Sequence, residues 1–146
     1  MMPRRIRYQG AIIQGGQILL IQHREHASGR VYWLLPGGGR EEGESEEECV
    51  IREMHEETGL EVKVERLLFD EPRPSGETIK RTYLCSILSG KPKPGYEPEK
   101  YAAEFYSIAA VGWFDLSQKD SWGELVRSDP FTYPQLKRLQ KILGYD

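Results

Sequence analysis

The first third of the chain is a series of short apolar runs interrupted by turn residues. Two runs, Tyr8 to Gln14 and Gln17 to Gln22, are separated by Gly15 and Gly16, which suit the tight connection of a β-hairpin. The polar stretch 23–30 predicts a loop. A third run, Val31 to Leu35, ends at a proline and three glycines, so it predicts a short strand that stops there.

The pattern changes to a helical period at Ser45. Ser45 and Glu48 have the spacing of a capping box, which predicts a helix beginning there and continuing to about Thr58. Gly59 fits the left-handed position that ends a helix. The predicted core face carries four residues, which are Val50, Ile51, Met54 and Thr58.

The remaining pattern predicts three strands and two helices. The strands are 61–69, 78–88 and 111–114, the helices are 117–127 and 133–143, and a long polar loop spans 89–104. This order favours an α+β fold, with a mixed β-sheet that carries helices on its faces. A length of 146 residues with 38% hydrophobic content fits one domain, 1–146.

Composition narrows the class of protein. No run approaches the roughly 18 apolar residues of a membrane helix, and the basic N-terminus lacks the apolar length of a signal peptide. Cys49 and Cys85 form no C-x-x-C motif, so we expect a reducing, cytoplasmic location. With a net charge of −3, we expect neither a nucleic-acid nor a membrane partner. We also expect a monomer or a homodimer.

The charge is concentrated in one block. Residues 38–60 hold nine Glu and two Arg, a local charge of −7, which leaves +4 for the other residues. On a helix, Glu53, Glu56 and Glu57 share one face, and carboxylates so close repel one another. Oxygen ligands of this kind bind Mg²⁺ or Mn²⁺, and Arg52 could orient Glu53. The alternative is an ordinary solvated helix face.

The order of residues around this helix resembles the Nudix box. The matching positions are Gly38, Glu44, Arg52, Glu53, Met54, Glu56, Glu57, Gly59 and Leu60. The preceding segment Trp33 to Gly38 resembles the usual lead-in, and Val111 to Phe114 resembles a late strand of the family, so the resemblance spans roughly 8–116.

This resemblance implies an α/β/α sandwich and a hydrolase that cleaves a nucleoside diphosphate joined to another group. It implies that Glu53, Glu56 and Glu57 ligate Mg²⁺ or Mn²⁺. The carbonyl of Gly37 or Gly38 would add an oxygen ligand. Arg52 would hold Glu53, together with Glu44, and an exposed helix pair is the alternative for these two residues.

The resemblance leaves the general base open, either Glu53 or a glutamate of the loop before the late strand. Glu97, Glu99 and Glu104 lie in that loop, and Glu104 is the first choice because it is nearest to the strand. Substrate-binding candidates are Arg24 for a phosphate, and Tyr32 and Tyr83 for stacking on a base. The alternatives are a solvent-exposed arginine and core tyrosines.

The expected substrate is a nucleotide, with a (d)NTP or a modified NTP first. ADP-ribose or another nucleotide sugar is the second choice, and Pro74 hints at ADP-ribose; diadenosine polyphosphates stay open. A protein of another class, a nucleotide-binding regulator without turnover, is the remaining alternative. Such a regulator could lose the box carboxylates, whereas all of them are present in this chain.

Overall fold

The computed structural model describes residues 6–96 and 105–146. Its strands are β1 (Arg7–Gln14), β2 (Gln17–Glu25), β3 (Val31–Leu34), β4 (Gly37–Gly38), β5 (Glu61–Pro72), β6 (Thr78–Ser89) and β7 (Tyr106–Asp115). Its helices are α1 (Glu46–Thr58), α3 (Glu124–Arg127) and α4 (Thr132–Leu143), with a 3₁₀ turn at Lys119–Ser121. No helix of the described segments has the length and apolarity needed to cross a membrane.

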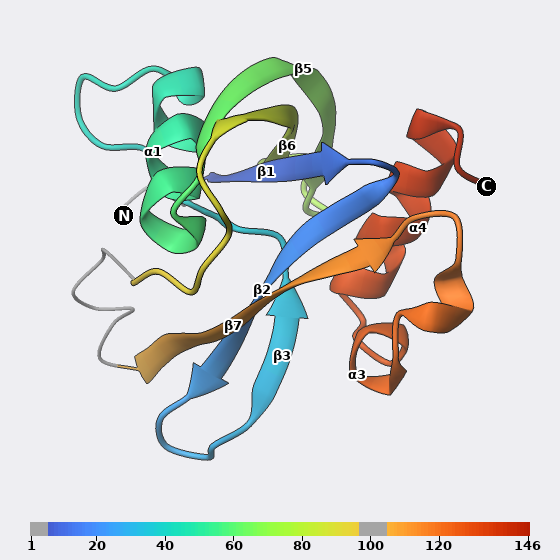
Figure 1. The fold of residues 1–146 in the computed structure, drawn as a ribbon. Coiled ribbons are helices and arrows are strands. Elements are labelled where there is room, and N and C mark those ends of the chain that lie inside the picture. Colours follow the sequence, from blue (N-terminus) through green and yellow to red (C-terminus); the bar gives the residue numbers. More distant parts are fainter. Residues whose placement is uncertain (1–5, 97–104) are drawn as a thin grey trace.

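Strand β1 is the centre of the sheet. It pairs in parallel with β6 from Arg7 to Ile12 and antiparallel with β4 at Tyr8 and Gln9, and its last residues form the hairpin with β2. Strand β6 also pairs antiparallel with β5, while β2 pairs antiparallel with both β3 and β7. Figure 1 shows how β2, β3 and β7 extend away from the β1, β5 and β6 end of the sheet.

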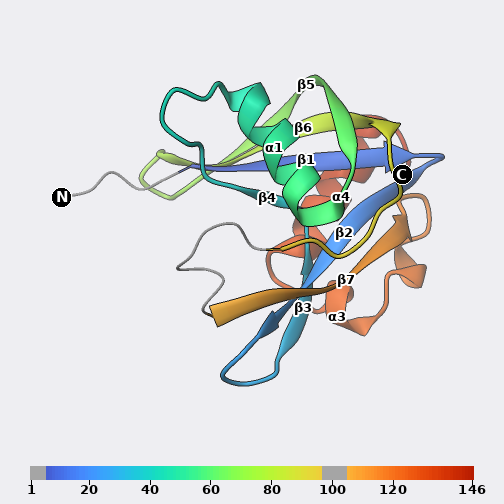
Figure 2. The ribbon, with the colours of Figure 1, turned by 60° about the vertical axis from the view of Figure 1, so that its left-hand side comes forward.

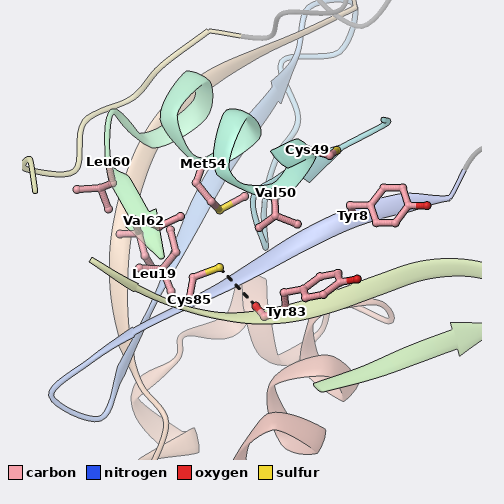
Figure 3. Close-up of a cluster of buried hydrophobic side chains, with 10 residues drawn as sticks. Tyr8, Leu19, Cys49, Val50, Met54, Leu60, Val62, Tyr83 and Cys85 are labelled. Atoms are coloured by element: carbon pink, nitrogen blue, oxygen red, sulfur yellow. Dashed lines mark hydrogen bonds between the residues drawn. The ribbon is translucent and has the colours of Figure 1, made fainter. Parts of the chain in front are cut away.

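Helices cover both faces of this sheet, and each face has its own core. On one side α1 packs Val50 and Met54 against Leu19 of β2 and Cys85 of β6 (Figure 3). On the other side α4 packs Leu136 and Leu139 against a cluster that includes Ile18 and Leu20. Successive residues of β2 thus enter opposite cores, as expected for a strand buried on both faces. The predicted mixed sheet and α/β/α sandwich are confirmed.

Helix α1 begins and ends as the sequence predicts. The Ser45 hydroxyl accepts a hydrogen bond from the Glu48 amide at 3.1 Å, and the Glu48 carboxylate accepts one from the Ser45 amide at 3.0 Å. Gly59 ends the helix with a φ of 76°. Figure 2 shows that the segment after β6 runs beside this end of α1. There the amides of Lys93 and Gly95 donate to the carbonyls of Thr58 and Glu57, both at 2.9 Å.

Several predicted elements differ in the structure. The strand predicted for 111–114 extends over Tyr106–Asp115 as β7, and the strand predicted for 61–69 continues to Pro72 as β5. The loop predicted for 23–30 was wrong at its start, because β2 continues to Glu25 and buries His23. This extension depends on pairing with β7, a distant segment. The single helix predicted for 117–127 is divided into a 3₁₀ turn and α3, because Gly123 between them has a φ of 83°.

Candidate active site

The second half of α1 carries three glutamates at the surface that meets the glycine corner. Glu53 and Glu57 are buried, while the Glu56 side chain is 15% exposed. Two ionisable side chains are thus buried on a helix that also carries the core residues Val50 and Met54. Burying a carboxylate is unfavourable unless hydrogen-bond partners or a cation compensate for the lost hydration. The neighbours of these glutamates therefore indicate the role of this helix face.

Arg52 provides a large part of that compensation. Its guanidinium donates to both oxygens of Glu44, from Nε at 2.7 Å and from Nη2 at 2.9 Å. Nη1 donates to Glu53 Oε1 at 3.0 Å and to Glu56 Oε2 at 3.1 Å, and Nη2 also donates to the Gly39 carbonyl at 3.1 Å. The Arg52 and Glu44 side chains are 19% and 13% exposed, so this is a partly buried network rather than a solvated pair.

The glycine corner approaches this face closely. The Gly37 amide donates to Glu57 Oε1 at 2.6 Å. A Cβ on Gly37 would overlap the Tyr8 carbonyl, and a Cβ on Gly38 would overlap the Glu53 carboxylate. Glycine is therefore required at both positions for β4 to lie between β1 and α1.

The electrostatics differ among the acids. Burial raises the pKa of Glu53 to about 7, against the opposing effect of Arg52. The Arg52 hydrogen bond lowers the pKa of Glu44, and the Glu44 hydrogen bond in turn raises the pKa of Arg52. Burial therefore disfavours the ionised form of Glu53, whereas Glu44 and Arg52 stabilise each other as ions.

The oxygen atoms of this helix face decide whether Mg²⁺ or Mn²⁺ fits there. Over 6–96 and 105–146, no three Asp, Glu, His or Cys side chains converge into a preformed cage. However, Glu53 Oε2 is buried without a hydrogen-bond partner among the described residues, and Glu56 lies on the same helix face, one turn further along. Carboxylate and carbonyl oxygens are the donors that these hard cations prefer, so the set fits such an ion.

A cavity of about 410 Å³ borders the glycine corner. It is lined by Gly37, Gly38 and Gly39, and by the polar and cationic residues Arg7, Gln9 and Lys80. The other residues that line it are Ile6, His23, Tyr32, Leu34, Tyr106, Asp129, Phe131, Thr132 and Gln135. The lining of the cavity therefore combines apolar and aromatic side chains with two cations, and Gly38 borders both the cavity and Glu53.

An aromatic cluster forms part of this cavity. The His23 ring stacks on Tyr106 with centroids 5.6 Å apart, and Tyr32 lies edge-on to His23 at 5.7 Å. Burial lowers the pKa of His23 to about 4 and raises the pKa of Tyr32 to about 12, so both rings are neutral near pH 7. Neutral rings of this kind can contact a nucleobase through their faces.

The structure places the predicted substrate-binding residues in different surroundings. Tyr32 lines the cavity. Arg24 is exposed on β2 and is absent from the cavity lining. Tyr83 lies in the core beneath α1 (Figure 3), where its hydroxyl donates to Glu46. Glu97, Glu99 and Glu104, the loop candidates for the base, lie outside the described residues.

Several cavity residues were not identified from the sequence. Arg7, Lys80, Asp129 and Phe131 come from two strands and from the start of α4, which are far apart in the chain. The one local signal was Lys80 followed by Arg81, because consecutive cations in a strand point to opposite faces of the sheet. Arg81 points away from the cavity and pairs with Glu46 at 3.0 Å.

Comparisons with known proteins find similar hydrolases. The NAD-capped RNA hydrolase NudC of Photobacterium profundum is 39% identical over 107 residues, which are 70% of this chain and 40% of that protein. An ADP-ribose pyrophosphatase of Methanocaldococcus jannaschii is 36% identical over 103 residues, which are 68% of this chain and 59% of that protein. The chain thus spans less than two-thirds of the length of these curated relatives.

Solved structures show the same fold. A MutT NUDIX hydrolase from Burkholderia pseudomallei has a TM-score of 0.65 and 30% identity, over 94% of this chain and 99% of that one. An ADP-ribose pyrophosphatase from Streptococcus suis has a TM-score of 0.67 and 25% identity, over 97% and 91%. The model of the NUDIX domain matches residues 4–127, which is most of the sequence. The chain therefore belongs to the Nudix family.

Proposed function

We propose that this chain is a metal-dependent hydrolase of the pyrophosphate linkage in a nucleoside diphosphate joined to another group. One observation carries the proposal: the buried Glu53 carboxylate, with one oxygen unpartnered among the described residues and the other fixed by Arg52, lies directly behind Gly38. Gly38 in turn borders the cavity, so a carboxylate site and a nucleotide-sized space are adjacent.

Each residue of the site has a proposed role. Glu53, Glu56 and Glu57, with the carbonyl of Gly37 or Gly38, would hold Mg²⁺ or Mn²⁺. When bound, such an ion neutralises phosphate charge and acidifies an attacking water. Arg52 fixes the Glu53 carboxylate, and Glu44 fixes Arg52. The general base is either Glu53 or the loop residue Glu104.

Two substrate classes are proposed. A (d)NTP or a modified NTP is the first, as expected from the sequence. ADP-ribose or another nucleotide sugar is the second, and a specific observation favours it: two similar proteins are named ADP-ribose pyrophosphatases, and a third neighbour, with a TM-score of 0.66 and 25% identity, is named UDP-X diphosphatase. Tyr32 would contact the base in either case.

The decisive experiment is a substrate panel with product identification. Purified chain is incubated with Mg²⁺ or Mn²⁺ and with NTPs, ADP-ribose, UDP-sugars, diadenosine polyphosphates and NAD-capped RNA. Release of pyrophosphate identifies a triphosphate substrate, and release of AMP with a sugar phosphate identifies ADP-ribose. Tight metal-dependent binding without turnover of any compound would support the alternative of a regulatory module.

The matched variants are Glu56→Gln and Glu57→Gln, with Glu47→Gln as the control. Glu47 lies on the same helix but is exposed, so its replacement should leave the rate unchanged. Each test variant should lower kcat by about a hundredfold or more, because a lost carboxylate weakens metal binding. An unchanged rate in both test variants would refute the metal site.

Three further expectations belong to this proposal. We propose that 1–146 acts as one domain, that it is a monomer or a homodimer, and that it works in the cytoplasm on small nucleotides rather than as a nucleic-acid-binding protein. Sedimentation or size-exclusion measurements test the oligomeric state, and the NAD-capped RNA in the panel tests the choice of small nucleotides.

A further inference from the structure

Two cations face the cavity from neighbouring strands. Arg7 of β1 and Lys80 of β6 are register partners in the parallel pair. Both side chains line the cavity, and both residues are half-buried. Like charges placed opposite each other on one face of a sheet destabilise it. The arrangement therefore carries a cost that an anion between the two side chains would remove.

Neither cation is paired directly with an acid of the described residues. Within 6–96 and 105–146, Arg7 and Lys80 form no salt bridge. The next residue of β6 shows the contrast, because Arg81 pairs with Asp70 at 2.8 Å and with Glu46 at 3.0 Å. Arg81, which points to the other face, is thus paired directly with acids. The two cavity cations interact with acids only at longer range, Arg7 with Glu53, and Lys80 with Glu71 and Asp129.

The partners that these two side chains do have leave donors available. Arg7 Nη2 donates to the Leu35 carbonyl at 2.9 Å, which fixes the guanidinium beside the glycine corner. Lys80 Nζ lies 5.2 Å from the centroid of Phe131, an aromatic residue that is 69% exposed at the cavity rim. Burial lowers the pKa of Lys80, and the nearby Arg7 charge acts in the same direction.

The acids closest to Lys80 are engaged elsewhere. Asp129 Oδ1 accepts the amides of Phe131 and Thr132, at 2.8 Å and 2.9 Å, at the start of α4. Glu71 Oε1 accepts from Gln135 Nε2 at 2.7 Å. These acids moderate the potential, but their hydrogen bonds hold them in the loop and against α4 instead of in an ion pair with Lys80.

We propose that Arg7 and Lys80 form an anion subsite that binds a phosphate group of the substrate inside the cavity. The proposal rests on the hydrolase function proposed above and adds a second contact for the phosphates. Glu53 lies behind Gly38, whereas Arg7 and Lys80 lie in the cavity that Gly38 borders. The polyphosphate is thus held from two sides, by the glutamate face and by the cation pair, whichever base it carries.

The assignment differs from the one made from the sequence, in which Arg24 binds the phosphate. Arg24 is exposed and absent from the cavity lining, while Arg7 and Lys80 lie in it. The two residues should act on binding more than on the chemical step, so their loss should raise KM for every nucleotide tested.

The test is isothermal titration calorimetry with inorganic pyrophosphate in EDTA, so that neither metal nor turnover is needed. Wild-type protein should bind pyrophosphate. Arg7→Gln and Lys80→Met should each weaken binding by roughly tenfold or more, and the double variant should bind too weakly to measure. Arg66→Gln and Lys63→Met, which replace exposed cations of β5, should bind as the wild type does.

Arg7→Lys separates charge from structure. It keeps the positive charge but alters the contact with Leu35, so it should retain affinity within about threefold if the charge is what matters. The proposal is overturned if folded wild-type protein fails to bind pyrophosphate, or if the folded double variant binds as tightly as the wild type. Pyrophosphate binding as predicted, without turnover of any substrate, would support the subsite and refute the hydrolase function. Turnover without the predicted pyrophosphate binding would support the hydrolase function and refute the subsite.

Discussion

Glu44 is the residue on which the geometry of the glutamate face depends most. Both of its oxygens accept from Arg52, and it is 13% exposed. We predict that Glu44→Gln lowers kcat by about tenfold or more with little change in KM, because Arg52 loses the partner that fixes it against Glu53. Steady-state kinetics on the substrate identified by the panel would measure this.

Glu41→Gln is the matched control for that variant. Glu41 lies 3.6 Å from Arg52 Nη1, but its side chain is 67% exposed, so the contact is screened by solvent. The kinetics should stay at the wild-type values. Equal losses in the two variants would mean that overall negative charge matters rather than the fixed position of Arg52.

His23 gives a second prediction at the residue scale, and it concerns stability. Burial, together with Arg7, lowers the pKa of His23 to about 4, from 6.5 for an unperturbed histidine. The unfolded chain therefore takes up a proton below pH 6.5 that the folded protein does not, and stability present above pH 6.5 is lost as the pH falls toward 4.

The expected loss from this group is about 2 kcal/mol between pH 7.5 and pH 5. Urea unfolding of wild-type protein and of His23→Phe at the two pH values measures the contribution of His23 to this loss, since the variant has no imidazole to protonate. The acid-side loss should be smaller in the variant by this amount. An identical loss in both proteins would show that His23 is not the group responsible.

At the scale of elements, the contact between β4 and α1 defines the site. A Cβ on Gly38 would overlap the Glu53 carboxylate, so Gly38→Ala must displace either the strand or the glutamate. We predict a loss of activity of about a hundredfold with a lower melting temperature, because a buried network is disturbed. Activity and thermal unfolding are measured on the same preparation.

Gly43→Ala separates packing from backbone conformation in that experiment. Gly43 has a φ of 79°, and a Cβ there would have no neighbour within 4 Å, so only the conformational cost of about 1 kcal/mol applies. It should lower stability slightly and leave the rate intact. Equal inactivation of the two variants would place the sensitivity in the loop rather than in the contact with Glu53.

Elements that depend on interactions between neighbouring residues were predicted accurately, whereas those that depend on distant segments were not. Helix α1 was predicted closely because its capping box and its terminal glycine act within a few residues. The extension of β2 through His23 was missed because it depends on β7, more than 80 positions later. Gly123 broke a predicted helix through a local φ of 83°, which a glycine permits but does not impose.

The same distinction holds for the site at the scale of the whole molecule. Glu53, Glu56, Glu57 and Arg52 were predictable because one helix brings them together. The cavity was not, because β1, β6 and the residues before α4 meet only after the two helical layers close on the sheet (Figure 1). Arg7 and Lys80 become neighbours through strand register, for which the separate sequences of the two strands gave no specific signal.

Folding of the whole molecule should also respond to the charge of Glu53. Burial raises the pKa of this carboxyl to about 7, above its ordinary value of 4.5. The folded protein then binds a proton that the unfolded chain releases, so metal-free protein loses stability as the pH rises from 4.5 through 7. Bound Mg²⁺ or Mn²⁺ should offset this loss, because the cation binds the ionised form.

We therefore predict that Glu53→Gln, in EDTA at pH 8, is more stable than the wild type by about 1–3 kcal/mol while its activity with metal is lost. The amide keeps an oxygen for Arg52 and removes the buried charge. Unfolding at pH 5 and pH 8, with and without Mg²⁺, tests this, and added Mg²⁺ should stabilise the wild type but not the variant. A variant destabilised equally at both pH values would show that ionisation of Glu53 does not lower the stability of the folded protein, which contradicts the prediction.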